Sequence, residues 1–137
     1  MLLGSSDKIK TEESNWNWSI LEKMTSVKLM SDNSIDFDFE PDIIVDAILG
    51  TGIVGEIREP YASAINYINK IDCYKFAVDV PSGLDPQTGD TANIYTKCNL
   101  TVTFHKMKQG IPKRKDLTGE LFVEKIGIPP EAENGIL

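Results

Sequence analysis

Two aspartates are the strongest candidates for chemistry, because each lies at or near the end of an apolar stretch. Asp46 lies within residues 42–49, and Asp79 lies near the end of residues 75–80. A carboxylate in such surroundings is costly to bury unless it is paired, hydrogen-bonded or bound to a cation. Asp46 fits a backbone-tethering role and a ligand role about equally. Asp79 is the better candidate, because a turn rich in hydrogen-bonding groups follows it, and it could act as a general acid or base if burial raised its pKa toward neutrality.

The serine in that turn is a candidate cation ligand rather than a nucleophile. Pro81-Ser82-Gly83 is not a Gly-x-Ser-x-Gly elbow, and the single histidine of the chain, His105, fits a polar loop residue better than a catalyst. A hydroxyl between two strand ends that carry carboxylates offers the oxygen ligands that hard cations prefer. Ser82 is therefore expected to contribute to a cation site.

A loop of spaced glycines follows the first apolar stretch. Gly50-Thr51-Gly52-Ile53-Val54-Gly55 has the spacing of the dinucleotide-binding fingerprint, and it lies between a predicted strand and a predicted helix. Glycines in such a loop let backbone N–H groups approach a phosphate closely. In the full fingerprint the third glycine already lies in the helix, whereas here Glu56–Glu59 come before Pro60. A structural turn and a phosphate-binding loop are therefore equally consistent with this motif taken alone.

Charge and cysteine content narrow the class of protein. The formal net charge of −7 argues against nucleic-acid binding. Residues 106–115 carry five cations, which fit either a solvated loop or a clamp for an anion such as pyrophosphate. No apolar run is long enough to span a membrane, and the first residues do not resemble a signal peptide. Cys73 and Cys98 match no metal-binding or redox spacing, so we expect reduced structural thiols in a cytoplasmic protein.

The candidate residues need a scaffold that brings separate strand ends together. Nearly continuous apolar stretches predict strands that are buried on both faces, over residues 42–49, 75–80, 100–104 and 120–126. An i, i+3 stripe predicts a helix over residues 60–71. Alternating strands and helices imply right-handed crossovers and a mainly parallel sheet, whose carboxyl edge is where ligands bind. The sequence therefore predicts one site at that edge.

The remaining segments are less regular. Leu2 and Leu3 resemble the end of a strand, and a helix is predicted from Thr11, with Trp16, Ile20, Leu21 and Met24 on one face. Residues 27–30 are a candidate strand, and residues 31–38 a polar loop. Residues 85–96 contain few apolar side chains and predict a loop, which leaves the pairing of the strands on either side of it open.

Several of these segments together resemble the NAD(P)H-hydrate epimerase family, the YjeF N-terminal domain. The resemblance rests on Val45–Gly52, Arg58–Pro60, Ala77–Asp85 and Leu100–Phe104, with further similarity at Gly119–Leu121 and Ile126–Pro129. It implies a Rossmann-like three-layer α/β/α fold with a mainly parallel sheet. It also implies an isomerase that interconverts the R and S forms of hydrated NADH or NADPH, so that a stereospecific dehydratase can restore the cofactor.

The resemblance also implies residue roles. Asp46 and Ser82 would coordinate a potassium ion, and Gly50 to Glu56 would hold the hydrated dinucleotide. Asp79 would contact the substrate and act as the acid–base group. Lys108 lies where the family has a lysine before a glycine, and it would contact a phosphate or the ring.

The chain departs from the family pattern at its N-terminus. The family domain begins with a helix, a strand and an Asn/Gly/Asp-rich loop that supplies another potassium ligand and phosphate contacts, and no such segment precedes Leu2. Residues 1–137 are therefore expected to form a partial, N-terminally truncated domain with an open sheet edge that favours a homo-oligomer or a dehydratase domain or subunit as partner. The alternatives are a non-catalytic nucleotide-binding module or half-site that needs another chain and, disfavoured by the late Pro60, an NAD-dependent oxidoreductase.

Overall fold

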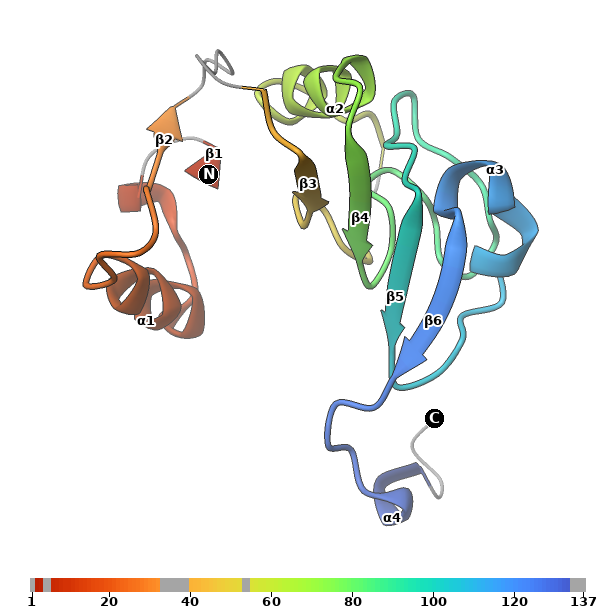
Figure 1. The fold of residues 1–137 in the computed structure, drawn as a ribbon. Coiled ribbons are helices and arrows are strands. Elements are labelled where there is room, and N and C mark those ends of the chain that lie inside the picture. The colour runs from red at the N-terminus through yellow and green to blue at the C-terminus, as the bar shows by residue number, and fades with distance from the viewer. Residues whose placement is uncertain (1, 4–5, 33–39, 53–54, 134–137) are drawn as a thin grey trace.

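The computed structural model describes residues 2–3, 6–32, 40–52 and 55–133 (Figure 1). In chain order its elements are β1 (Leu2–Leu3), α1 (Glu12–Leu21), β2 (Ser31–Asp32), β3 (Ile43–Asp46), α2 (Tyr61–Lys70), β4 (Tyr74–Val78), β5 (Leu100–Phe104), α3 (Lys115–Thr118), β6 (Glu120–Glu124) and α4 (Pro130–Glu133). Short 3₁₀ helices span Ser6–Lys8 and Ile111–Arg114. No helix in these ranges is long and apolar enough to cross a membrane.

The main sheet has four strands in the order β3-β4-β5-β6, and every neighbouring pair is parallel. Strand order therefore follows chain order without a reversal. Crossovers between parallel strands are right-handed, so connections that always step in the same direction all fall on the same face of the sheet. We call this side the covered face and the other side the open face.

Side-chain burial agrees with that topology. The register of the sheet places Asp46, Ala77, Thr101 and Thr103 on one face, and all four are fully buried. The side chains that alternate with them point to the open face and are partly buried or exposed, and they are mainly apolar: Ile43, Val45, Phe76, Val78, Leu100, Val102, Phe104 and Phe122. Ile43, Val45 and Phe122 are 61%, 55% and 52% exposed. The connections between the strands thus build one helical layer, on the covered face.

Helix α2 contributes the largest helical part of the core. Its apolar stripe buries Ala64, Ile65 and Ile68, and Pro60 occupies the position before its first residue. The side chain of Asn69 ties the helix to the β4–β5 connection, because its amide donates to the Tyr95 carbonyl at 2.7 Å and its oxygen accepts from the Lys97 N–H at 2.9 Å. The helix predicted over residues 60–71 is confirmed.

The first part of the chain forms a second, two-stranded parallel sheet from β1 and β2. Helix α1 begins as predicted, because the hydroxyl of Thr11 accepts from the Ser14 N–H and caps the first turn. Its predicted apolar face is largely exposed, and Trp16 is 71% accessible to solvent. The strand expected at residues 27–30 lies instead at Ser31–Asp32, and most of the expected 31–38 loop lies outside the described residues.

The Rossmann-like α/β fold with a mainly parallel sheet is confirmed. Strand β5 has its predicted bounds, the ends of β4 and β6 lie within two residues of the predicted ones, and β3 ends at Asp46, three residues before the predicted end. The link between β4 and β5 has no helix or long strand, as predicted, yet the two strands pair in parallel.

Candidate functional site

Asp46 ends β3 and lies at the centre of a buried network of hydrogen bonds. Its Oδ1 accepts from the Ser82 hydroxyl at 2.7 Å, and its Oδ2 accepts from the Ser82 N–H at 2.8 Å and from the Thr96 hydroxyl. All three side chains are fully buried. The network therefore joins the end of β3 to the turn after β4 and to the crossover that leads into β5.

Ser82 also fixes the point from which the glycine loop departs. Its hydroxyl oxygen accepts from the Leu49 N–H at 2.9 Å and lies 3.3 Å from the Leu49 carbonyl oxygen. The next residue must be glycine, because Gly83 has φ +88° and an added Cβ would lie 2.3 Å from the Ile94 carbonyl oxygen. The Pro81-Ser82-Gly83 turn is thus held in place on both sides by backbone contacts.

The donor set around Asp46 fits a hard cation. A carboxylate, the Ser82 hydroxyl and the Leu49 carbonyl are all oxygen ligands. Asp46 forms no ion pair with any described residue, and a buried, unpaired carboxylate is costly. No group of three or more His, Cys, Asp or Glu side chains in the described ranges could hold a metal, so a cation here would rely on hydroxyl and carbonyl oxygens.

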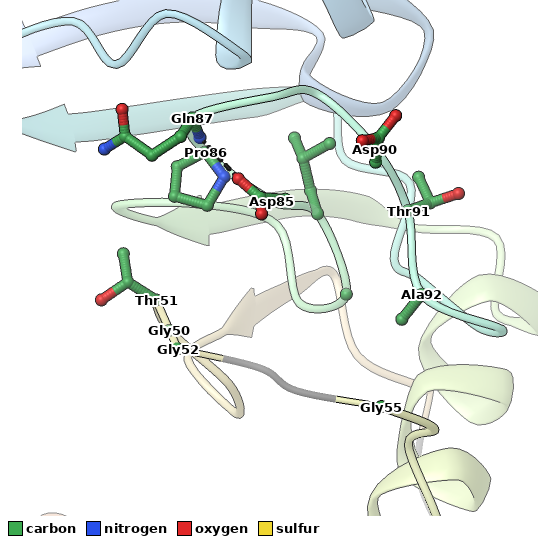
Figure 2. A pocket seen from close by; sticks show the side chains of 12 residues that line it. Gly50, Thr51, Gly52, Gly55, Asp85, Pro86, Gln87, Asp90, Thr91 and Ala92 are labelled. Carbon is green, nitrogen blue, oxygen red and sulfur yellow. Dashed lines mark hydrogen bonds between the residues drawn. The ribbon is translucent and has the colours of Figure 1, made fainter.

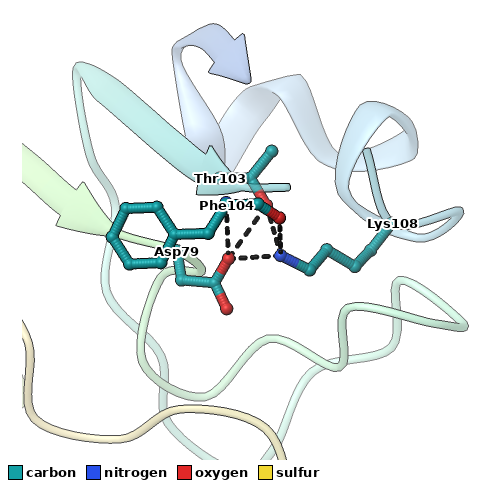
Figure 3. A network of polar contacts seen from close by, with 4 residues as sticks. All are labelled: Asp79, Thr103, Phe104 and Lys108. Carbon is teal, nitrogen blue, oxygen red and sulfur yellow. Dashed lines mark hydrogen bonds and ion pairs between the residues drawn. The ribbon is translucent and has the colours of Figure 1, made fainter. Parts of the chain in front are cut away.

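Asp79 follows β4 and has a backbone conformation that is uncommon for a residue other than glycine, with φ 67°. Its Oδ1 accepts from the Phe104 N–H at 2.9 Å, from the Thr103 hydroxyl at 3.1 Å and from the Lys108 ammonium (Figure 3). Lys108 also donates to the Thr103 hydroxyl at 2.8 Å and to the Phe104 carbonyl at 3.0 Å. The carboxylate and the ammonium therefore form one pair, oriented by the end of β5.

The pKa of Asp79 lies below its ordinary value of 3.8. Burial raises the pKa, but the hydrogen bond from Lys108, the Phe104 N–H, the charge of Lys108 and the Thr103 hydroxyl together outweigh that effect. The condition that burial raises the pKa of Asp79 toward neutrality is therefore not met. At neutral pH Asp79 is an ionised carboxylate that can accept a proton but has none to give.

The glycine loop forms one wall of a cavity of about 480 Å³ (Figure 2). The opposite wall is the segment after β4, and the lining residues are Gly50, Thr51, Gly52, Gly55, Gly83, Leu84, Asp85, Pro86, Gln87, Asp90, Thr91 and Ala92. A second cavity of about 370 Å³ adjoins the same loop and includes Glu56 and Arg58. Ile53 and Val54, which were predicted to bind substrate, lie outside the described residues.

The predicted site residues thus fall into three groups at the carboxyl edge of the sheet. Asp46 and Ser82 contact each other, Asp79 contacts Lys108, and the glycines with Thr51 line the larger cavity. The described lining of that cavity contains no residue of the first two groups.

Two functional candidates were missed at the sequence level. Thr96 contacts Asp46 across 50 residues of chain, a separation that no local pattern reveals. Thr103 binds both Asp79 and Lys108, and the available signal was its alternation with apolar residues in β5.

The cation-rich segment is largely committed to the protein itself. Lys108 binds Asp79, Lys113 donates to the Thr88 carbonyl at 3.2 Å, and Arg114 binds Asp116 and the Gly89 carbonyl. This arrangement favours a structural role over an anion clamp. Cys98 is a free, buried thiol whose pKa burial and the nearby Asp46 charge raise to about 12, as suits an unreactive thiol.

A parallel α/β sheet with polar residues gathered at its carboxyl edge is typical of Rossmann-like domains. A family comparison makes the assignment specific: residues 1–110 match the family described as YjeF-related protein N-terminus. The chain belongs to this family.

Curated relatives are similar over the whole chain. It is 83% identical to an NAD(P)H-hydrate epimerase of Nitrosopumilus maritimus and 66% identical to one of Cenarchaeum symbiosum, in each case over all of this chain and 64% of the relative. It is also 46% identical to a bifunctional NAD(P)H-hydrate repair enzyme Nnr of Methanothermobacter thermautotrophicus, over 96% of this chain and 27% of that protein. The chain thus spans just under two thirds of the length of the two archaeal epimerases.

Proposed function

We propose that this chain contributes to the epimerisation of the R and S forms of hydrated NADH and NADPH. The observation that carries the proposal is the Asp79–Lys108 pair at the carboxyl edge of a parallel sheet, in a chain that is 83% identical to a protein named for this activity. Rossmann-like sheets bind dinucleotides at this edge.

Epimerisation at the hydroxyl-bearing ring carbon needs a group that takes a proton. If the ring opens, the hydroxyl gives up its proton as the carbon–nitrogen bond breaks, the nitrogen keeps the bonding electron pair, and closure on the other face returns the proton to the oxygen. If water is lost, the hydroxyl leaves with a proton taken from solvent while the lone pair of the ring nitrogen forms a carbon–nitrogen double bond, and the water that adds to the other face gives up a proton in return. Asp79 can serve either route, because it is ionised at neutral pH and can accept that proton, although its lowered pKa makes it a weaker base than an ordinary aspartate.

Lys108 acts through Asp79 in this proposal. Its ammonium donates to Asp79, Thr103 and the Phe104 carbonyl, so its donors point toward the end of β5. That arrangement favours a Lys108 that keeps the Asp79 carboxylate ionised beside the ring. It does not favour a Lys108 that contacts a phosphate. The glycine loop, from Gly50 to Glu56, would hold the pyrophosphate through its backbone N–H groups.

Potassium is the cation that we propose for the Asp46–Ser82 group, with the Leu49 carbonyl as a further ligand. When bound, it would supply a positive charge that neutralises the buried Asp46 carboxylate and attracts the substrate phosphates. The test is thermal unfolding of the chain in potassium, sodium and choline chloride at equal ionic strength. A rise in Tm that is specific to potassium and absent in Asp46→Asn supports the site, whereas equal values in the three salts reject it.

A second candidate function is a half-site that another polypeptide segment completes. The edge position of β3 and the apolar open face favour it, because both leave the sheet without a neighbour among the described residues. A dehydratase domain, a dehydratase subunit or a second copy of this chain would be such a partner, and free Cys73 and Cys98 suit a reducing cytoplasm. Light scattering discriminates, since a complete module should be monodisperse and a half-site should associate.

The main experiment follows a mixture of R and S NADPH hydrate in the presence of potassium and an S-specific dehydratase. We expect the R form to disappear faster with the chain than by spontaneous epimerisation. Asp79→Asn should reduce that gain by about 10²–10⁴-fold, the usual contribution of a general base. Asp72→Asn, an exposed aspartate in the turn before β4, serves as the control. Consumption at the spontaneous rate would refute an autonomous epimerase and leave the half-site reading.

A further inference from the structure

The described lining of the larger cavity contains acidic side chains and no cation. Among its described lining residues Asp85 and Asp90 carry charge, and Thr51, Gln87 and Thr91 supply uncharged polar groups. A phosphate placed against the wall that carries Asp85 and Asp90 would face two carboxylates at close range and would be repelled there. The cavity is therefore suited to an uncharged group that donates hydrogen bonds.

Asp85 is held in a fixed orientation by its own turn. Its Oδ1 accepts from the Gln87 N–H at 2.7 Å and from the Thr88 N–H at 3.0 Å, and these bonds lower its pKa. The Asp85 N–H donates to the Asp90 carbonyl at 2.8 Å, which closes the turn. Both backbone hydrogen bonds go to Oδ1, the Thr88 hydroxyl also contributes to the lowered pKa, and Figure 2 shows Asp85 on the side of its segment that faces the glycine loop. The side chain is thus an ionised acceptor that faces the glycine loop.

We infer that this cavity binds a ribose of the hydrated dinucleotide and that Asp85 accepts hydrogen bonds from the ribose hydroxyl groups. The inference rests on the proposed function and adds a binding residue to it. In a dinucleotide each ribose is an uncharged, donor-rich group one bond away from a phosphate. Here the wall that suits a phosphate, the glycine loop, faces the wall that carries Asp85. Carboxylates are the usual acceptors for ribose hydroxyls in dinucleotide-binding folds.

The adenosine ribose and the nicotinamide ribose both offer such hydroxyl groups. A comparison of the two hydrates as substrates shows which of them occupies the cavity. NADPH hydrate differs from NADH hydrate by a phosphate on the adenosine ribose. If that ribose occupies the cavity, Asp85 should make the chain prefer NADH hydrate. If the nicotinamide ribose occupies it, Asp85 should matter equally for both hydrates.

The first experiment compares kcat/KM for both hydrates in the full chain, in Asp85→Asn and in the control Asp72→Asn. Asparagine keeps an oxygen for the Gln87 and Thr88 N–H groups and replaces the other acceptor oxygen with a donor. We expect Asp85→Asn to raise KM for NADH hydrate about tenfold, the typical effect of losing a hydrogen bond to a charged group. A smaller loss for NADPH hydrate assigns the adenosine ribose, and an equal loss assigns the nicotinamide ribose. Values that match Asp72→Asn for both hydrates overturn the inference.

A second experiment needs no turnover. Chemical-shift titrations of the full chain with AMP, 2′-deoxy-AMP and nicotinamide mononucleotide report binding of one ribose phosphate at a time. AMP or nicotinamide mononucleotide should bind the unsubstituted chain several-fold more tightly than Asp85→Asn. If AMP is the better ligand, 2′-deoxy-AMP should lose this advantage. Binding that depends on Asp85 without any epimerisation would refute an autonomous epimerase and keep the inference, whereas equal binding to both proteins would overturn the inference whatever the activity.

Discussion

The two faces of the four-stranded sheet have opposite characters. On the covered face Asp46, Thr101 and Thr103 are fully buried although they are polar. On the open face apolar side chains such as Ile43, Val45 and Phe122 are more than half exposed. The side chains of these three residues are all hydrogen-bonded: Asp46 to Ser82 and Thr96, Thr101 to the Thr118 carbonyl at 2.9 Å, and Thr103 to Asp79 and Lys108.

This contrast shows that topology decides which side of a strand becomes the interior. Because the strand order never reverses, every right-handed connection in this sheet covers the same face. The polar residues on that face can be buried only because they bond to the connections themselves. The open face is mainly apolar, as a protein core is. A partner segment or a second copy of the chain would therefore be stabilised most by packing against this side of the sheet.

The largest effect should come from breaking the buried network on the covered face. Asp46→Ala removes the acceptor of the Ser82 N–H and of the Thr96 hydroxyl, and it leaves both groups buried without it. We expect the free energy of unfolding to fall by about 3 kcal/mol or more. Urea unfolding followed by circular dichroism measures this change.

Asp42→Ala is the matched control, because Asp42 is an exposed aspartate immediately before the same strand. Its free energy of unfolding should change by no more than about 0.5 kcal/mol. Similar values for the two variants would show that the Asp46 network does not hold the covered face together.

The Asp79–Lys108 pair on the covered face should make the free energy of unfolding depend on pH, and the pKa of Asp79 sets the sign of that dependence. The folded pKa of Asp79 lies below its ordinary value of 3.8, so the pair stabilises the fold at neutral pH and loses this contribution as the pH falls below 3.8 through the folded pKa. Lys108→Met should therefore raise the pKa of Asp79, and its stability deficit relative to the unsubstituted chain should shrink in acid. Carboxyl chemical shifts and urea unfolding at neutral and acid pH measure both effects. A deficit that is equal at the two pH values would mean that the pair contributes no charge interaction.

The fold could be predicted from sequence to the extent that local signals decide it. Strand β5 was predicted with its observed bounds because Leu100–Phe104 combines β-branched and aromatic residues between clear breaks. Which of its sides is buried could not be read in the same way. The sequence predicted burial on both faces, whereas the structure fully buries only Thr101 and Thr103, because the connections lie on their side of the sheet.

The candidate site was predictable where it follows from strand ends. Asp46, Asp79 and the glycine loop lie at the carboxyl edge, as expected for parallel strands. The partners that set their properties lie far away in sequence: Thr96 for Asp46, and Thr103 with Lys108 for Asp79. The direction of the Asp79 pKa shift depends on those partners, so sequence reasoning, which could consider burial alone, could not predict it.

The smallest effect on stability should come from substitutions on the open face. They test the difference between the two faces of the sheet most sharply. Val45→Thr and Phe122→Thr replace side chains that are 55% and 52% exposed, so each should change the free energy of unfolding by no more than about 1 kcal/mol. Ile65→Ala in α2, which empties a fully buried position, should cost about 2–5 kcal/mol.

The two open-face variants should also bind less of a hydrophobic dye such as ANS and scatter less light at high protein concentration. A loss of stability close to that of Ile65→Ala would show that something covers this face in solution, and a concentration dependence of that loss would identify the cover as a second copy of the chain.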